Sequence, residues 1–301
     1  MSDVSMEFEV LDAQTIKLEV PYWPDRHDES GDREGRQDFW GREVVSRTKR
    51  LRLAPSCSGW QEDLPHPDEV PIVMPALGFD TPNHQDDIYL ELPRASALIR
   101  GWVIWFVPLS LAFLAMLLWD YLPAMQAIRF ELHLMVIATL IVGIWSICIF
   151  WKFDVAPPRD QPLRFNRARQ RLYAYNFNYR WWNPFERWRV EPVAYDWSQV
   201  RAERWLKRGA TSHGVVIKGG VVLSIVRPGT NEVIDRFPLT TMGADAHAWA
   251  YICTYMQQGP DALPPPGSPK DHDDVGFNIA LLLAPKVKWP ADMDRESRTA
   301  P

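Results

Sequence analysis

The chain has 301 residues, a formal charge of −5 at pH 7 and three cysteines. This length is enough for one or two domains, and the acidic balance argues against a general nucleic-acid binder. Charge is segregated along the chain, however, because residues 159–208 carry eleven arginines and one lysine against five acidic residues. The scattered cysteines form neither a disulfide framework nor a zinc-binding spacing. We therefore expect no nucleic-acid partner, and a basic surface confined to one part of the protein.

Residues 1–93 are acidic and rich in proline. Nine prolines interrupt the longer periodic runs, and the first ten residues lack the apolar core of a cleavable signal peptide. The aromatic residues of this region are more numerous than is usual in a disordered segment. We expect an N-terminal cytoplasmic region that is partly ordered by packing on the rest of the protein.

Two long apolar runs, residues 101–119 and 132–151, are separated by only a dozen residues. A helix rises about 1.5 Å per residue, so each run is long enough to cross the roughly 30 Å hydrocarbon layer of a bilayer. Each run should be helical, since lipid offers no hydrogen-bond partners to the backbone. We predict a transmembrane hairpin over residues 94–153, with spans at about 100–120 and 131–151.

Basic residues flank this hairpin on one side only. Two arginines precede the first span and six basic residues follow the second, between Lys152 and Arg171, whereas the turn between the spans carries Arg129 alone. The positive-inside rule then places both termini in the cytoplasm. The sequence therefore predicts a multi-pass protein of the bacterial inner membrane, whose first partner is the lipid bilayer.

Residues 160–260 have the pattern of a β-rich domain. Strand-like alternation covers residues 163–177 and 192–206, and residues 215–226 and 233–239 are the clearest hairpin, because a Pro-Gly turn joins them. We expect the Gly219-Gly220 pair to make a smaller turn that divides the first of these two strands.

The β-rich part ends in residues 244–258, which have the spacing of an amphipathic helix that stops at Gly259. The predicted fold is an integral membrane α-helical hairpin plus an α+β cytoplasmic domain. In that domain an antiparallel sheet of about six or seven strands is capped by a C-terminal helix, an order that pleckstrin-homology domains also have. Fold analogy of this kind carries no function.

The tail, residues 261–301, starts with a proline-rich acidic linker. Its short apolar segment, residues 275–284, is too short to cross a membrane. We expect this segment to be packed or interfacial, with docking under the basic domain favoured over contact with the membrane.

Three segments carry a family resemblance: PLRFNRARQRLYAY at residues 162–175, WAYICTYMQQGP at 249–260 and WPADMDRESR at 289–298. Over residues 95–301 the chain resembles an uncharacterised family of bacterial inner-membrane proteins, in which two adjacent spans precede a strand of the P-[IL]-RFNR type. The resemblance implies a gene neighbourhood of type VI secretion effectors, and hence an immunity or accessory role. The tail departs from the family pattern, because it carries less apolar length.

The most unusual soluble segment is residues 178–197, where tryptophans are interleaved with arginines. Such residues can anchor a protein interface, or they can contact anionic headgroups at about 1 kcal/mol per basic residue. Alternatively, some of the tryptophans form the domain core while the arginines only satisfy the positive-inside rule, and these interpretations overlap. The residues that we expect at a partner or membrane-surface contact are Arg180, Trp181, Trp182, Arg187, Trp188 and Arg189.

Motifs for catalysis and cofactor binding are missing from the sequence. It has no HExxH pair, no phosphate-binding loop and no GxSxG elbow. His133, at the outer end of the second span, is expected to be an interfacial histidine rather than part of a proton relay. We therefore expect no catalytic residue, no cofactor, no metal and no enzymatic activity.

Two functions fit these expectations. The first is a non-enzymatic inner-membrane binding protein with a protein partner, such as an immunity or accessory protein for a type VI secretion effector. The alternative is a membrane-organising or lipid-headgroup-sensing protein that uses the arginine-tryptophan surface. Transport is less favoured, because the polar lining of two spans is meagre.

Overall fold

The part of the chain that the structure describes includes both apolar runs and most of the sequence after them. Residues 1–50, much of the linker before residue 276 and the predicted site residue Trp181 lie outside it. The computed structural model describes residues 52–77, 81–94, 100–180, 182–211, 214–239, 246–265, 267 and 276–301.

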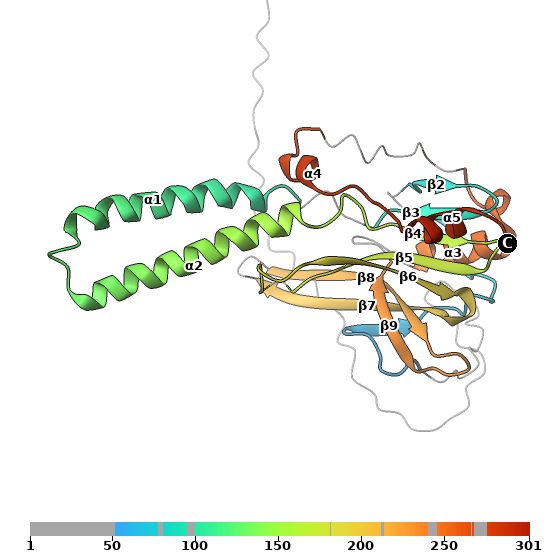
Figure 1. The fold of residues 1–301 in the computed structure, drawn as a ribbon. Helices are drawn as coiled ribbons and strands as arrows, with labels where there is room; N and C mark the ends of the chain where they lie inside the picture. Colours follow the sequence, from blue (N-terminus) through green and yellow to red (C-terminus); the bar gives the residue numbers. More distant parts are fainter. Residues whose placement is uncertain are drawn as a thin grey trace, which may run out of the picture. The chain divides into compact units, whose positions relative to one another are not determined.

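The two apolar runs form the long helices α1 (Phe106–Ala124) and α2 (Phe130–Val155), and a 3-10 turn η1 (Val103–Trp105) precedes α1. They run antiparallel in Figure 1 and pack closely where Gly143 faces the Leu114 side chain. In the most apolar 18-residue stretch of each helix, only 11% and 6% of the residues are buried, so neither helix is packed in the interior of the described fold. The prediction of two long apolar helices is confirmed. Both are long and apolar enough to cross a membrane, and the crossing itself stays a prediction.

The strands form two antiparallel sheets rather than one. The five-stranded sheet has the order β2 (His84–Gln85), β3 (Tyr89–Leu92), β4 (Leu163–Asn166), β5 (Arg171–Asn178) and β6 (Arg189–Asp196). The four-stranded sheet has the order β1 (Trp60–Asp63), β7 (Val200–Thr211), β8 (Gly214–Val226) and β9 (Val233–Pro238).

The prediction of a single sheet of six or seven strands is therefore wrong, whereas its antiparallel pairing and its helical cap are confirmed. The added strands β1, β2 and β3 come from the proline-rich region before the hairpin. They are only two to four residues long, too short to show a period of their own. Segments that precede and follow the hairpin in the sequence thus form one fold.

The expected turn at Gly219-Gly220 is also wrong, because β8 runs unbroken through both glycines. Gly219 pairs with Leu206 and Gly220 pairs with Trp205 across the β7–β8 ladder. The indole of Trp205 covers Gly220, at a distance that would just admit a methyl group. An aromatic ring over a strand glycine supplies the packing that the glycine lacks.

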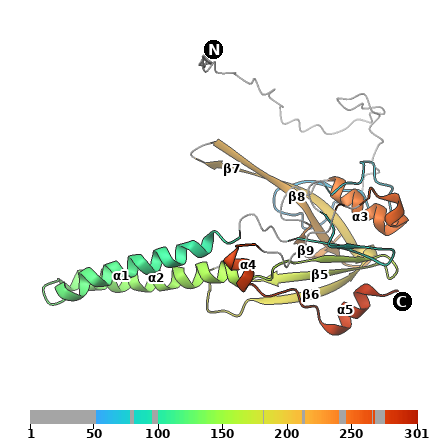
Figure 2. The same ribbon diagram turned by 90° about the horizontal axis from the view of Figure 1, so that it is seen from above.

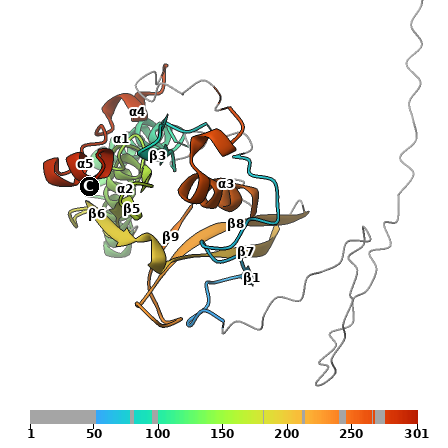
Figure 3. The ribbon, with the colours of Figure 1, turned by 90° about the vertical axis from the view of Figure 1, so that its right-hand side faces the viewer.

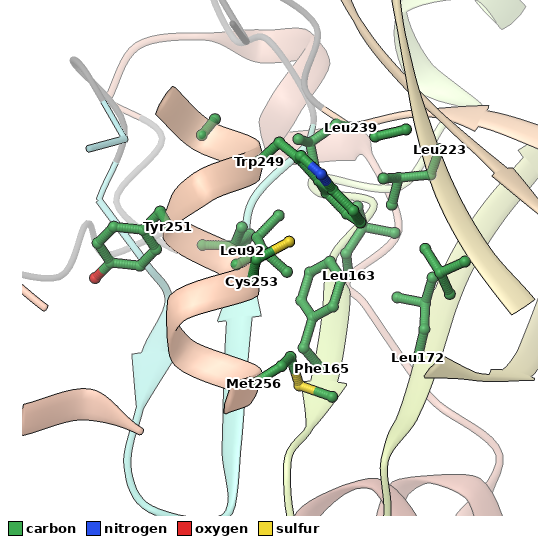
Figure 4. Packing of buried hydrophobic residues seen from close by; sticks show 14 of the residues in the cluster. Leu92, Leu163, Phe165, Leu172, Leu223, Leu239, Trp249, Tyr251, Cys253 and Met256 are labelled. Atoms are coloured by element: carbon green, nitrogen blue, oxygen red, sulfur yellow. The ribbon is translucent and has the colours of Figure 1, made fainter. Parts of the chain in front are cut away.

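Helix α3 (Ala246–Gln258) lies over the main core and ends at Gly259, whose φ of +96° is left-handed. Figure 4 shows its residues Trp249 and Met256 facing Phe165 of β4. All of residues 248–256 are buried, which an amphipathic helix with one wet face would not show. The outer face is covered by residues 64–77, since the Gln257 amide donates to two carbonyls of this segment.

The five-stranded sheet carries a helix on each face, as Figure 3 shows: α3 on one side and α5 (Ala291–Arg298) on the other. The alternation along β5 explains this, because Leu172 and Ala174 point into the main core while Tyr173 and Tyr175 face Trp289 before α5. The four-stranded sheet differs, because residues 207–211 and 214–218 pair only with each other among the described strands. They extend as a two-stranded ribbon (Figure 2).

Candidate membrane-surface site

Five of the six predicted site residues lie in the described part of residues 179–189, a segment that joins β5 to β6 and ends at Arg189, the first residue of β6. We call it the β5–β6 loop. It lies against the last turns of α2, where the ring of Phe153 makes edge contacts with Tyr179 at 5.7 Å and Trp188 at 6.0 Å between centroids. Tyr179 and Trp188 also touch each other at 5.2 Å. The loop is therefore fastened to the end of the second apolar helix.

Lys152 makes a second attachment. Its ammonium group donates to the Glu186 carbonyl at 2.7 Å and lies 5.2 Å from the centre of the Trp188 ring. The Trp188 indole in turn donates to the Asn183 carbonyl at 3.2 Å. Aromatic pairs and cation–π contacts each stabilise by about 0.5–1.5 kcal/mol. Trp188 is thus an inner, positioning residue of the loop.

Two other described aromatic residues of the loop face outward. Trp182 is 54% exposed and Phe185 is 76% exposed, although both are large and apolar. Arg187 and Arg189 are exposed beside them, and Arg180 is exposed while its guanidinium lies 3.6 Å from the Glu186 carboxylate. The loop therefore exposes both apolar rings and guanidinium groups, a combination that suits a boundary between water and lipid headgroups.

The loop also encloses an open hollow of about 460 Å³. Three of its lining residues are arginines and two are glutamates, and Glu191 is engaged by the Asn178 amide at 2.6 Å. Guanidinium groups match phosphate oxygens in geometry as well as charge. The hollow is lined by Asn178, Tyr179, Arg180, Glu186, Arg187, Trp188, Arg189 and Glu191.

The two arginines that precede the first span have structural roles beyond topology. Arg94 is 4% exposed and donates to the carbonyls of Tyr175 and Gln161, while its backbone N–H donates to Asp160. Burial lowers the pKa of Arg94 to about 10, and Asp160 opposes that shift. Arg94 thus joins the chain entering the hairpin to the chain leaving it.

Arg100 makes a similar connection closer to the helices. It donates to the carbonyls of Asp154 and Pro158 at 3.0 and 2.5 Å. The buried Asp154 carboxylate accepts the backbone N–H of Ile104 at 2.6 Å. Sequence reasoning used these arginines only as topology signals, since their partners lie more than 50 residues away.

The structure also shows the surroundings of two other residues that the sequence analysis considered. His133 accepts or donates a 2.6 Å hydrogen bond with the Tyr121 hydroxyl, at the turn end of the hairpin. Trp197, from the aromatic-basic stretch, is a core residue that is 3% exposed. The interpretation that part of the tryptophan set belongs to the core therefore holds for Trp197.

The Cys57 thiol lies beside the buried Glu203 carboxylate, whose oxygen accepts the Cys57 backbone N–H at 3.0 Å. Burial, and then the charge of Glu203, raise the pKa of the Cys57 thiol to about 11, so little thiolate forms at neutral pH. Within the described segments, no three histidine, cysteine or acidic side chains come together to hold a metal ion.

Comparison with known proteins gives one match. The model of a family described as "Family of unknown function (DUF6708)" matches residues 140–280, just under half of the chain. The matched stretch begins within α2 and includes the β5–β6 loop, both strands of the ribbon and α3. The expected similarity to an uncharacterised family is confirmed at this level. No curated protein and no solved structure matches the chain.

Proposed function

We propose that this chain is a non-enzymatic binding protein, anchored in a bacterial inner membrane by α1 and α2 with both termini in the cytoplasm. In this proposal the β5–β6 loop seats the sheet domain on the anionic headgroups of the inner leaflet. One observation carries it: the loop is fastened to Phe153 at the end of α2 while Trp182 and Phe185 remain exposed beside arginines.

The contact with α2 sets the depth of the loop. If α2 crosses the bilayer, Lys152 and Phe153 lie at its cytoplasmic boundary, where basic and aromatic residues are favoured. A loop in contact with them then lies at headgroup level. Three arginines near an anionic surface contribute about 1 kcal/mol each, and salt weakens this attraction. This attraction is enough to keep the sheet domain bound to the membrane surface, because the spans already tether the domain close to that surface.

The test uses the full chain in nanodiscs of phosphatidylcholine with or without phosphatidylglycerol. A Phe185→Cys variant, in a background without the native cysteines, carries an environment-sensitive fluorophore. We expect blue-shifted emission and quenching by headgroup-level spin-labelled lipid when phosphatidylglycerol is present. Emission typical of water in both lipid mixtures would contradict the headgroup contact.

A matched pair of charge variants isolates the role of the loop. Neutralising Arg180, Arg187 and Arg189 to Gln should abolish the dependence on phosphatidylglycerol. Neutralising three other exposed arginines changes the net charge equally and should leave the dependence intact. The control residues are Arg227, Arg295 and Arg298, which are 58%, 75% and 51% exposed.

A second candidate function, binding of a protein partner, is favoured by the ribbon. Residues 207–211 and 214–218 leave their outer backbone edges without a neighbouring strand among those described. Such edges accept an added strand from another chain. In line with the family resemblance, the partner proposed is a secreted effector, which the protein would neutralise or position.

This second candidate has its own test. Full-length protein purified in detergent should retain an effector that is encoded by a neighbouring gene. Replacing residues 207–218 by a short turn should release this effector. A gene deletion that is harmless while the neighbouring toxin gene is intact would rule out the immunity role.

A further inference from the structure

The apolar tail segment forms a short helix, α4 (Ile279–Leu283), at the base of the hairpin. Its first residue is capped by Asn278, whose side-chain oxygen accepts the Leu281 N–H at 3.2 Å. The amide group of the same side chain donates to the Arg100 carbonyl at 2.8 Å. Asn278 therefore fixes the start of α4 to the chain that enters the first apolar helix.

The other end of α4 is held by the chain that leaves the second apolar helix. The Arg159 guanidinium donates to the Leu281 carbonyl at 3.0 Å, and the Arg159 backbone N–H donates to the Pro285 carbonyl at 2.9 Å. The helix also packs against α2. With partners for its cap and its last carbonyls, α4 has a fixed place beside the hairpin.

The two faces of α4 differ in burial although both are apolar. Ala280, Leu281 and Ala284 are buried against the base of the hairpin. On the other face Leu282 and Leu283 are 54% and 51% exposed. Ile279 is 46% exposed, and Phe277, which precedes the cap, is fully exposed, so four large apolar residues in and beside α4 are about half exposed or more.

We infer that α4 is an interfacial membrane helix, with this open face buried at the boundary between headgroups and acyl chains of an anionic bilayer. The inference rests on the proposed function, because a bilayer must surround α1 and α2 for α4 to reach it. Two observations select lipid as the occupant. The helix α4 packs against α2, whose apolar side chains are largely exposed, and exposed Lys286 and Lys288 follow α4 directly, where they can reach headgroup phosphates.

A second lipid contact has a mechanical consequence. Figure 1 shows α4 and the β5–β6 end of the five-stranded sheet on different sides of α2. One contact beside the hairpin would leave the domain free to tilt about it, whereas contacts on two sides fix the tilt. The domain would then present the ribbon to a partner in one orientation.

The experiment places one fluorophore at a time on full-length protein in nanodiscs that contain phosphatidylglycerol. The labelled positions are Leu282→Cys in α4, Ile144→Cys in the middle of α2 and Ile234→Cys on β9, all about half exposed. Two nitroxide-labelled lipids quench the fluorophore, one at headgroup level and one deep among the acyl chains. The label in α4 should lose about half of its emission to the headgroup-level quencher, as expected for burial at the acyl boundary. The label in α2 should respond to the deep quencher, and the label on β9 to neither.

The outcomes separate the inference from the proposal beneath it. If the Ile144 label is quenched and the Leu282 label shows emission typical of water, α4 does not contact lipid and the inference is wrong, while anchoring stands. A Leu282 label that is shielded from water but not quenched by lipid means a protein contact, which also overturns the inference. An unquenched Ile144 label removes the membrane proposal itself, and the inference with it.

A variant gives an independent check. Leu282→Asp with Leu283→Asp places two charges on the open face, and a Phe277→Cys label should then lose its quenching. The domain should unfold at an unchanged temperature, since both leucines are half exposed. Retained quenching would contradict the inference.

Discussion

The two sheets each bury one charged side chain, and the charges have opposite signs. In the five-stranded sheet Arg164 is 2% exposed and donates to Glu91, to Asp294 at 2.7 Å and to Ser297 at 2.8 Å. In the four-stranded sheet Glu203 is fully buried. It accepts from Ser224, from Arg236 at 2.9 Å and from the Cys57 backbone at 3.0 Å.

The difference lies in where the partners come from. The partners of Arg164 lie 73 to 133 residues away, before the hairpin and in the C-terminal helix. Two partners of Glu203, Ser224 on β8 and Arg236 on β9, lie only 21 and 33 residues further along the chain. Both sheets join chain from before and after the hairpin, but the network of the five-stranded sheet also holds the C-terminal helix α5, whereas the four-stranded sheet carries the free ribbon. A broken buried pair costs more than an intact one contributes, so both networks can be tested by substitution.

The largest effect is expected for Arg164→Met. The change leaves the Glu91 carboxylate without its buried partner and frees α5, so stability should fall by about 3–5 kcal/mol. The measurement is chemical unfolding of the full chain in detergent. Arg204→Met is the matched control, since this half-exposed arginine pairs with Glu62 at 3.2 Å and should cost less than about 1 kcal/mol. Equal losses would contradict the central place of Arg164.

A smaller loss is expected for Glu203→Gln. The amide keeps the shape of the carboxylate and removes the charge-assisted bond to Arg236, so we expect a loss of about 1.5–3 kcal/mol in the same assay. Arg236 is partly exposed and also donates to the Pro55 carbonyl, which limits the damage. A loss as large as that of Arg164→Met would show that the two networks are equivalent.

Gly101→Ala tests the junction between the hairpin and α4. Gly101 has a φ of +94°, and an added Cβ would collide with the Asn278 side chain. The left-handed backbone alone costs about 1–2 kcal/mol for other residues. Gly229→Ala is the matched control, because its φ is +72° but the space around it is open. The Gly101 variant should lose more stability than the control and should expose a label at Leu282. Equal behaviour would mean that Asn278 moves aside freely.

The smallest effect is on pH dependence. Because folding raises the pKa of Cys57 from about 9 to about 11, the native state holds this proton in that range. This contribution to stability is therefore present below pH 9 and is lost as the pH rises towards 11. Alkylation of Cys57 at pH 8 should be about a hundredfold slower than that of an ordinary thiol. Glu203→Gln should lower the pKa and speed the reaction, and an unchanged rate profile would exclude coupling between the two groups.

Local patterns were enough to predict part of this fold. The apolar runs, the β8–β9 hairpin and helix α3 each have a period that a single segment reveals. The strands β1, β2 and β3 were missed, because two to four residues in a proline-rich region show no period. Helix α5 was missed for a related reason, since its role depends on Arg164 and Asn166, more than 120 residues earlier.

The candidate site divides in the same way. Its composition identified the loop, because tryptophan and arginine interleaved at this density are rare in a soluble segment. Its attachment could not be read from the sequence, since Phe153 and Lys152 meet Trp188 only in the folded chain. The exposed Trp182 and the half-buried Trp188 look alike in sequence, and only the fold separates a surface residue from a positioning residue.

The orientation of the chain in the membrane is the most direct test of the proposed function, because every proposed lipid contact depends on it. In protein without native cysteines, single cysteines at Met125 in the turn and at Ile234 on β9 would be treated with a membrane-impermeant maleimide on spheroplasts. Both side chains are about half exposed. We expect Met125→Cys to react in intact spheroplasts and Ile234→Cys to react only after lysis. Labelling of Ile234→Cys before lysis would place the sheet domain outside the cytoplasm and would contradict the proposed function.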